Sequence, residues 1–190
     1  MDLFLQVWGG LFYLLAKVFL AHAEGEESSK WRIPGWFVYL YGIPPWVLIL
    51  AEEHNWIAMT IEVGAAPAMI LGIIFAKKGR EDIPPLLDNL TKVFVYGLII
   101  AGFGYSIYEF GGINSFSQIL ECGITAGSLV GTYLLSKKDG QGWLWFVLMN
   151  VSMGTLMGMQ EKWILVLLQV VSLYFAISGY RRSRRRNGKR

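Results

Sequence analysis

Long apolar stretches recur along the whole chain and are separated by short polar segments. Seven of them approach the length of about 20 mostly apolar residues that a helix needs to cross a membrane. Because a backbone in lipid must satisfy its own hydrogen bonds, each stretch is predicted to be a helix. The pattern therefore predicts an all-α polytopic membrane protein with seven transmembrane helices. The predicted spans are 3–22, 34–51, 56–76, 93–109, 116–136, 143–159 and 163–180.

The composition agrees with a membrane protein and excludes several other classes. Of the 190 residues, 54% are hydrophobic and 16% are charged, whereas a soluble domain carries about 25% charged residues. Cys122 is the single cysteine, which excludes a disulfide framework and a cysteine-based metal site. The sequence contains no phosphate-binding loop, no serine elbow and no zinc-protease motif. We therefore expect neither an enzyme nor a bound cofactor or metal.

The distribution of lysine and arginine predicts the orientation. With the N-terminus outside, all but two of the 17 basic residues fall in or beside the inside segments, as expected for cytoplasmic loops. Lys162 is outside, and Lys17 is expected to extend from the first span to the inner surface. The C-terminus is then cytoplasmic. Its basic residues indicate an anchor on anionic lipid rather than a nucleic-acid site.

The second and third spans resemble the sixth and seventh when the chain is shifted by 107 residues without a gap. The shift divides the chain into a first three-helix bundle (1–76), a linker with the fourth transmembrane helix (77–115), a second bundle (116–180) and a basic tail (181–190). One linking helix gives both bundles the same orientation, and such parallel repeats hold a substrate pocket between them near mid-membrane. The coincident positions are Gly35-Trp36 with Gly142-Trp143, Trp56 with Trp163, Glu62 with Gln169, and Gly72 with Gly179.

Polar residues inside the predicted spans are candidates for that pocket, because buried polar groups in a membrane are costly. The candidates are Glu62, Glu121, Asn150 and Gln169. An alternative interpretation places Glu62 and Glu121 near the outer interface, where water reaches them. The alternative for Asn150 is a hydrogen bond between helices, worth roughly 1 kcal/mol.

Aromatic side chains supply the other candidates. Trp143, Phe146 and Asn150 share one helix face, which can stack on a flat ring and hydrogen-bond its edge. Tyr41 and Trp46 flank the pair Pro44-Pro45, which is predicted to bend or unwind the second span and to oppose Asn150. A purely structural role in core packing is the alternative for each of these groups.

The segment from Leu120 to Arg182 resembles the PnuC family of bacterial vitamin transporters, best known for nicotinamide riboside. The resemblance is carried by Glu121, the pair Lys137-Lys138, Trp143 with Asn150 seven residues later, and Gly179 followed by basic residues. This chain departs from the family in three places. Phe146 replaces a second tryptophan, Gln169 stands where an aromatic residue is common, and Glu62 stands where glutamine is frequent.

The resemblance implies a SWEET-like fold with a 3+1+3 arrangement of helices in the bacterial inner membrane. It implies facilitated diffusion of a small vitamin, trapping by a cytoplasmic kinase and a homotrimer in lipid. It assigns substrate binding to Trp143, Asn150, Gln169 and Glu62. Nicotinamide riboside is the leading prediction and thiamine the alternative, since both are aromatic cations that suit a buried carboxylate. Two other classes remain open, a membrane sensor or assembly subunit without transport and an intramembrane enzyme that uses Glu62 and Glu121.

Overall fold

The computed structural model describes residues 2–24, 30–52, 56–78 and 85–187, and these residues form only helices and the turns between them. Six of the helices are each long and apolar enough to cross a membrane. The all-α, multi-pass membrane architecture predicted from the sequence is therefore confirmed. The helices are α1 (Asp2–Ala23), α2 (Arg32–Glu52), α3 (Trp56–Gly64), α4 (Ala66–Lys78), α5 (Pro85–Phe110), α6 (Phe116–Ser136), α7 (Gly142–Met159) and α8 (Trp163–Asn187).

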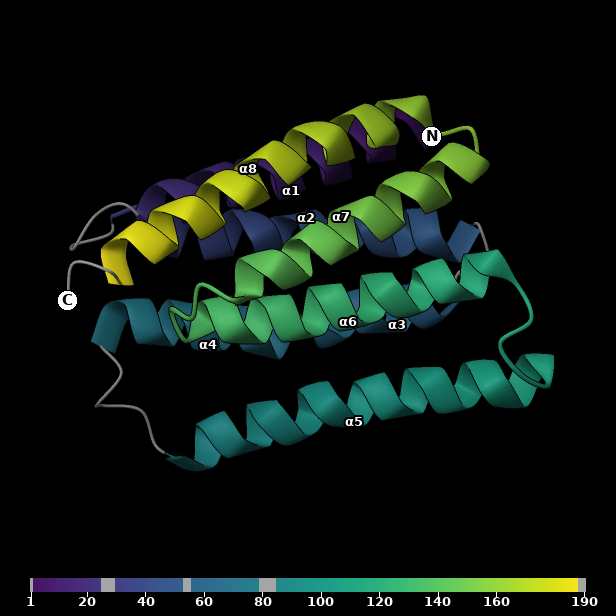
Figure 1. Ribbon diagram of the computed structural model, residues 1–190, viewed down its shortest axis with the longest axis horizontal. Coiled ribbons are helices and arrows are strands. Elements are labelled where there is room, and N and C mark those ends of the chain that lie inside the picture. The colour runs from purple at the N-terminus through teal and green to yellow at the C-terminus, as the bar shows by residue number, and fades with distance from the viewer. Residues whose placement is uncertain (1, 25–29, 53–55, 79–84, 188–190) are drawn as a thin grey trace.

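The predicted third span is divided into α3 and α4 by a break at Ala65. Pro67 explains the break, because it has no N–H to donate and its ring clashes with the carbonyl four residues earlier. Ala65 N still donates to Ile61 O at 3.0 Å and Met69 N to Ala65 O at 3.1 Å. Helices α3 and α4 follow one another along the bundle (Figure 1). When these two helices are counted as one segment, the chain runs along the bundle seven times.

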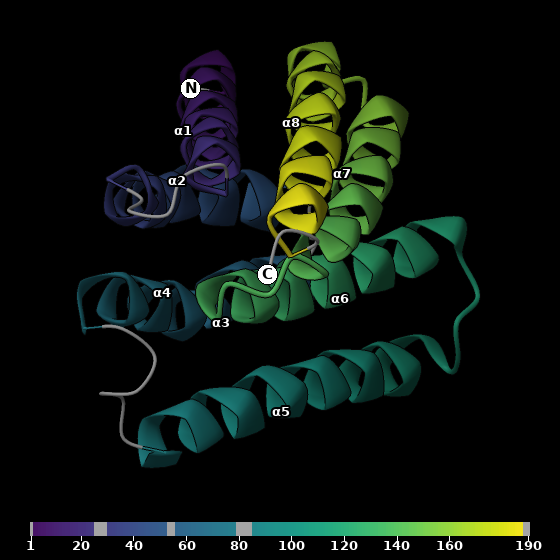
Figure 2. The same ribbon diagram turned by 60° about the vertical axis from the view of Figure 1, so that its left-hand side comes forward.

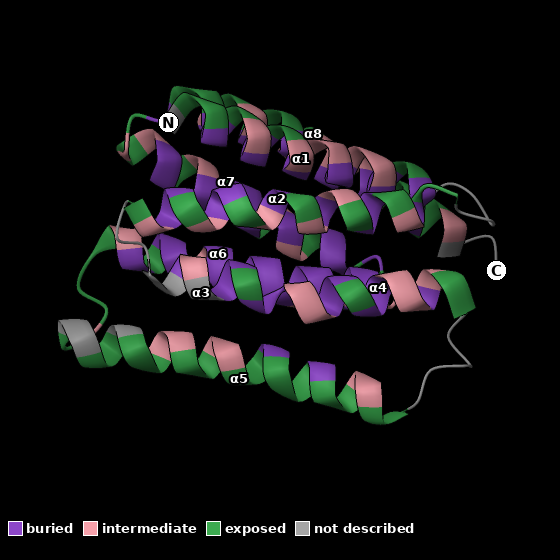
Figure 3. Cartoon of the chain, turned by 180° about the vertical axis from the view of Figure 1, so that it is seen from behind, coloured by how far each residue is buried: buried purple, intermediate pink, exposed green. Residues whose placement is uncertain are grey.

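The helices form two groups that contact one another, with α5 at the edge. In the first group α1 packs on α2, and α2 packs on α3 and α4; in the second, α6 packs on α7 and α7 on α8. The groups meet where α1 contacts α8 and where α6 contacts α3 and α4. Figure 2 shows α5 lying beyond α6, and Figure 3 shows that most of its surface is exposed. An exposed apolar helix of this kind suits contact with lipid.

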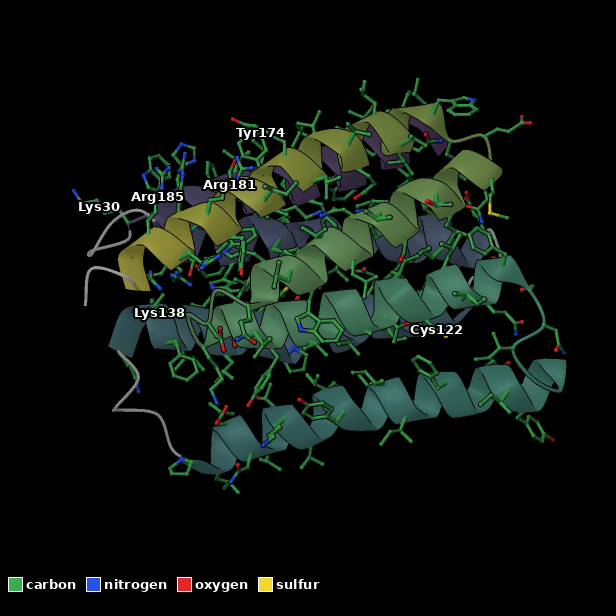
Figure 4. All side chains as sticks on the ribbon, viewed as in Figure 1. Lys30, Cys122, Lys138, Tyr174, Arg181 and Arg185 are labelled. Atoms are coloured by element: carbon green, nitrogen blue, oxygen red, sulfur yellow. The ribbon has the colours of Figure 1, made fainter. Side chains whose placement is uncertain are left out.

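The two ends of the bundle differ in charge. The N-terminus lies at one end and the C-terminus at the other (Figure 1). Lys30, Lys138, Arg181 and Arg185 lie toward the end that carries the C-terminus (Figure 4), which we call the basic end. Helix α8 continues to Asn187, so most of the basic segment from 181 onward is helical.

The proline pair in α2 does not unwind the helix. The helix is continuous from Arg32 to Glu52, so the prediction of an unwound segment is wrong. This part of α2 packs closely against α1. A Cβ added at Gly9 would lie 3.3 Å from both Pro45 and Trp46. Trp46 Nε1 also donates a hydrogen bond to the Gly9 carbonyl at 3.2 Å. The close approach of α1 and α2 therefore holds this part of α2 in place.

Candidate functional site

Polar residues from three predicted spans are buried inside the bundle. Glu62 of α3 is 0% exposed, Asn150 of α7 is 2% exposed and Gln169 of α8 is 3% exposed. The Tyr13 hydroxyl of α1 donates a hydrogen bond to Glu62 Oε2. Asn150 Nδ2 donates to the Phe146 carbonyl at 2.6 Å, which fixes the amide so that its oxygen faces the interior. Neither Glu62 nor Asn150 is a residue of the outer surface.

Lys17 of α1 also belongs to this group of buried polar residues, although the sequence predicted that it reaches the membrane surface. Its ammonium donates to Asn150 Oδ1 at 2.5 Å and attracts the Glu62 carboxylate. The side chain is fully buried, so the expectation that it extends to the inner surface is wrong. Lys17 lies one helical turn after Tyr13, and residues four apart share a helix face. Both side chains therefore point at the same interior site.

Aromatic rings from α2 and α7 meet beside these polar groups. Trp36 stacks on Tyr39 with centroids 6.2 Å apart, and Trp143 contacts Phe146 edge to face at 5.9 Å. Tyr39 and Phe146 join the two pairs across the bundle at 5.9 Å. We call Tyr13, Lys17, Tyr39, Glu62, Phe146 and Asn150 the central cluster.

Two glycines hold the tryptophans against the interior. A Cβ added at Gly72 would lie 2.5 Å from the Trp36 ring, and a Cβ added at Gly179 would lie 2.5 Å from the Trp143 ring. Only a residue without a side chain allows so close an approach of indole and helix backbone. The two contacts occupy positions that coincide under the shift of 107 residues.

Several buried polar atoms of the two helix groups have no hydrogen-bond partner among the described residues. Leaving a buried donor or acceptor unpaired costs about 1–3 kcal/mol, so native proteins contain few. Here two donors and one acceptor of this kind lie on α2, α7 and α8, which belong to both groups. The atoms are Trp36 Nε1, Trp143 Nε1 and Gln169 Oε1. The hydroxyls of Ser128 and Thr132 lie within hydrogen-bonding reach of Tyr39, and that of Ser128 also lies near Glu62.

Three of the sequence-derived candidates are not members of the central cluster. Trp46 is buried beside the cluster, with its ring 5.5 Å from that of Tyr13. Tyr41 is 64% exposed and contacts Phe12 on the outer surface, since it lies on the opposite face of α2. Glu121 lies near the start of α6 beside the backbone of Ala58, about two helical turns from Ser128.

The central cluster is shielded from solvent in this conformation. Its side chains are almost completely buried, and its rings belong to the packed core. The rings and polar groups of the expected lining are present, and the Lys17 ammonium lies among them, 6.0 Å from the centroid of Phe146.

Ion pairs connect the two helix groups at the basic end. Glu24, which follows α1, lies 2.9 Å from Arg32 of α2 and 3.0 Å from Arg186 of α8. Arg32 also donates to the Leu135 carbonyl of α6 at 3.1 Å. Glu24 and Arg32 are buried. We call Glu24, Arg32, Leu135 and Arg186 the basic-end network, and it ties α1 and α2 to α6 and α8.

Repeated passes of apolar helices around an enclosed polar and aromatic site define a multi-pass membrane protein. The chain belongs to the nicotinamide mononucleotide transporter family, whose model matches residues 5–185. The match confirms the resemblance inferred from the second half of the sequence and extends it over the first half. No curated protein and no solved structure matches the chain significantly.

Proposed function

We propose that this protein mediates facilitated diffusion of a water-soluble aromatic vitamin, with nicotinamide riboside as the first candidate and thiamine as the second. The observation that carries the proposal is the central cluster, which combines a buried carboxylate, a buried amide and rings from both helix groups. The family supports transport of a vitamin-like substrate. The cluster supplies the contacts that an aromatic cation needs.

Each group in the cluster has a role toward such a substrate. The faces of Tyr39 and Phe146 offer stacking, and a cationic ring gains roughly 0.5–2 kcal/mol from each good aromatic contact. Asn150 and the unpaired Gln169 amide hold hydroxyl or amide groups of the substrate. The Glu62 carboxylate balances the positive charge. Trp36 and Trp143, whose indole N–H groups lack partners, add donors at the edge of the site.

We infer that the two helix groups form a 3+1+3 repeat and move against each other in alternating access. Two observations support the repeat: equivalent glycines contact equivalent tryptophans, and the equivalent residues Tyr39 and Phe146 meet at the interface. The basic-end network ties helices of the two groups together, and in this proposal it acts as the gate at the basic end. Inward release then requires the separation of Glu24 from its arginines.

The orientation and the fate of the substrate are part of the same proposal. Cytoplasmic placement of the basic end follows the positive-inside rule, with the N-terminus outside the bacterial inner membrane. A transporter without its own energy source accumulates substrate only if the cell consumes it, so we propose trapping by a cytoplasmic kinase. A homotrimer in which the exposed helix α5 contacts neighbouring copies completes the proposal, and chemical cross-linking in membranes tests it.

Calorimetric titration of the purified protein with nicotinamide riboside, thiamine and riboflavin tests the substrate class. We expect binding of one or both cations in preference to neutral riboflavin. The Asn150→Ala variant should bind the cation more weakly than the matched Leu148→Ala variant, because Leu148 is an exposed neighbour on the same helix. Binding of none of the three vitamins would contradict the proposal. Equal affinities of the two variants would remove Asn150 from the site.

A further inference from the structure

The Lys17 ammonium already lies among the groups that the proposed function assigns to a cationic substrate. It donates a hydrogen bond to Asn150, lies over the ring of Phe146 at 6.0 Å and attracts the Glu62 carboxylate. Amide, aromatic face and carboxylate are the three kinds of group that recognise an aromatic cation. The side chain thus has the same partners as the substrate would have.

Both cations cannot occupy these partners together. Two positive charges about 6 Å apart in a partly screened protein site repel each other enough to weaken binding by about 100-fold. A single carboxylate, Glu62, offsets only one of them. The buried amide oxygen of Asn150 already accepts a hydrogen bond from Lys17 in this conformation. A cationic ligand must therefore move the ammonium before it can take these contacts.

The lysine side chain is suited to such movement. Its charge sits at the end of a flexible four-carbon stem, unlike the planar fork of arginine. Lys17 lies one turn from Tyr13, whose hydroxyl remains on Glu62 through its own hydrogen bond. The ammonium can therefore leave Asn150 without loss of the Tyr13–Glu62 contact.

We propose that Lys17 is a tethered cation that occupies the cation position of the site in the closed, substrate-free protein and is displaced by a cationic substrate. This inference rests on the proposed function. Return of the ammonium to Asn150 and Glu62 expels the substrate and lets the site close again. Competition from Lys17 thus lowers the affinity of the site for cations and favours dissociation of the substrate. It also determines how strongly the site distinguishes charged from neutral rings.

Nicotinamide riboside and its dihydro form provide a test, because they have similar shapes and the same ribose and amide but differ in ring charge. Calorimetric titrations compare wild type, Lys17→Met and Lys17→Gln; the Gln variant keeps a hydrogen-bond donor for Asn150 without the charge. The control is Lys92→Met, which removes an exposed lysine of α5. Thermal unfolding of each variant in detergent identifies the folded ones.

We expect the ratio of cation affinity to neutral affinity to rise by at least about tenfold in a folded Lys17 variant. Lys92→Met should keep the wild-type ratio. An unchanged ratio, or a ratio shifted toward the neutral form, would overturn the role of Lys17. Equal weakening of both forms would also overturn it, since Lys17 would then support the site without competing for it. If the wild-type protein binds neither form, the proposed function fails. This outcome is distinct from a failure of the Lys17 proposal, in which the wild-type protein binds but the affinity ratio does not rise in the variants.

Discussion

The basic-end network provides a sharp test of how the transporter closes. The perturbation is Glu24→Gln, which keeps the size of the side chain and removes its negative charge. Glu24 is the single acidic partner in the network for Arg32 and Arg186, at 2.9 and 3.0 Å. After the substitution, Arg32 retains the Leu135 carbonyl and the introduced amide oxygen as acceptors, but it has lost the negative charge that Glu24 supplied.

The magnitude follows from the burial of the three side chains. Removal of one partner from a buried ion pair costs about 3–5 kcal/mol, because the remaining charge is left in a poorly solvated site. The side chain of Arg32 is 3% exposed, whereas that of Arg186 is 22% exposed and is partly stabilised by water. The lower end of the range therefore applies. About 3 kcal/mol corresponds to a shift of roughly 100-fold in the equilibrium between closed and open basic ends.

Alkylation of an introduced cysteine measures this equilibrium. Ser136 at the end of α6 is fully buried and neighbours Leu135, so Ser136→Cys in a Cys122→Ser background reports opening of the basic end. A membrane-impermeant maleimide reaches the cysteine only in the open state. In vesicles with an exposed basic end, Glu24→Gln should accelerate labelling by one to two orders of magnitude, on the order of the shift derived from the lost ion pairs.

Asp88→Asn provides the matched control, because it makes the same chemical change in a second ion pair at the same end. Lys137 and Asp88 lie 2.8 Å apart, but their side chains are 21% and 28% exposed. Such an exposed pair is worth about 0–1 kcal/mol, so labelling should change little. Equal labelling rates in wild type and Glu24→Gln would refute the assignment of this network as a gate.

Three further perturbations have defined outcomes. Gly72→Ala and Gly179→Ala each place a methyl group 2.5 Å from an indole ring and should destabilise the protein by about 1–3 kcal/mol; Gly97→Ala, with open space around it, should be neutral or mildly stabilising in the same thermal unfolding assay. Glu62→Gln should weaken binding of nicotinamide riboside more than binding of its neutral dihydro form in calorimetry, and equal weakening would contradict a role in charge balance. Arg186→Gln should accelerate the maleimide labelling less than Glu24→Gln does, because its guanidinium is partly exposed; a larger effect would mean that Arg186, not Glu24, holds the end closed.

The helices could be predicted because each depends on local composition. The lengths of the apolar stretches set the spans, and only the third span is divided, at a position that Pro67 marks in the sequence. The pairing of Glu24 with Arg186 could not be predicted in this way. Their contact joins residues from opposite ends of the chain, and no local pattern specifies it.

The central cluster was only partly predictable. Glu62 and Asn150 stand out as polar residues within apolar spans, and the structure brings both to one site with Lys17. Lys17 was missed because its place toward the inner end of a span favoured the surface, whereas its partners come from other helices. The shift of 107 residues could have identified Trp36 and Tyr39 as candidates, since they coincide with Trp143 and Phe146.

Helical periodicity could also have separated two aromatic candidates. Tyr41 and Trp46 are five positions apart on α2, so they cannot both face the interior. Trp46 is buried and Tyr41 is exposed. Which of the two faces inward depends on contacts with α1, such as the hydrogen bond from Trp46 to Gly9, and these are not visible in the sequence of α2 alone.

Uptake by reconstituted vesicles tests the central claim most directly. Purified wild type in liposomes, supplied with radiolabelled nicotinamide riboside and thiamine, should move at least one of them faster than protein-free vesicles do. Asn150→Ala should reduce that rate and Leu148→Ala should preserve it. Uptake of neither vitamin above the rate of empty vesicles would contradict the claim that the buried cluster carries an aromatic vitamin across the membrane.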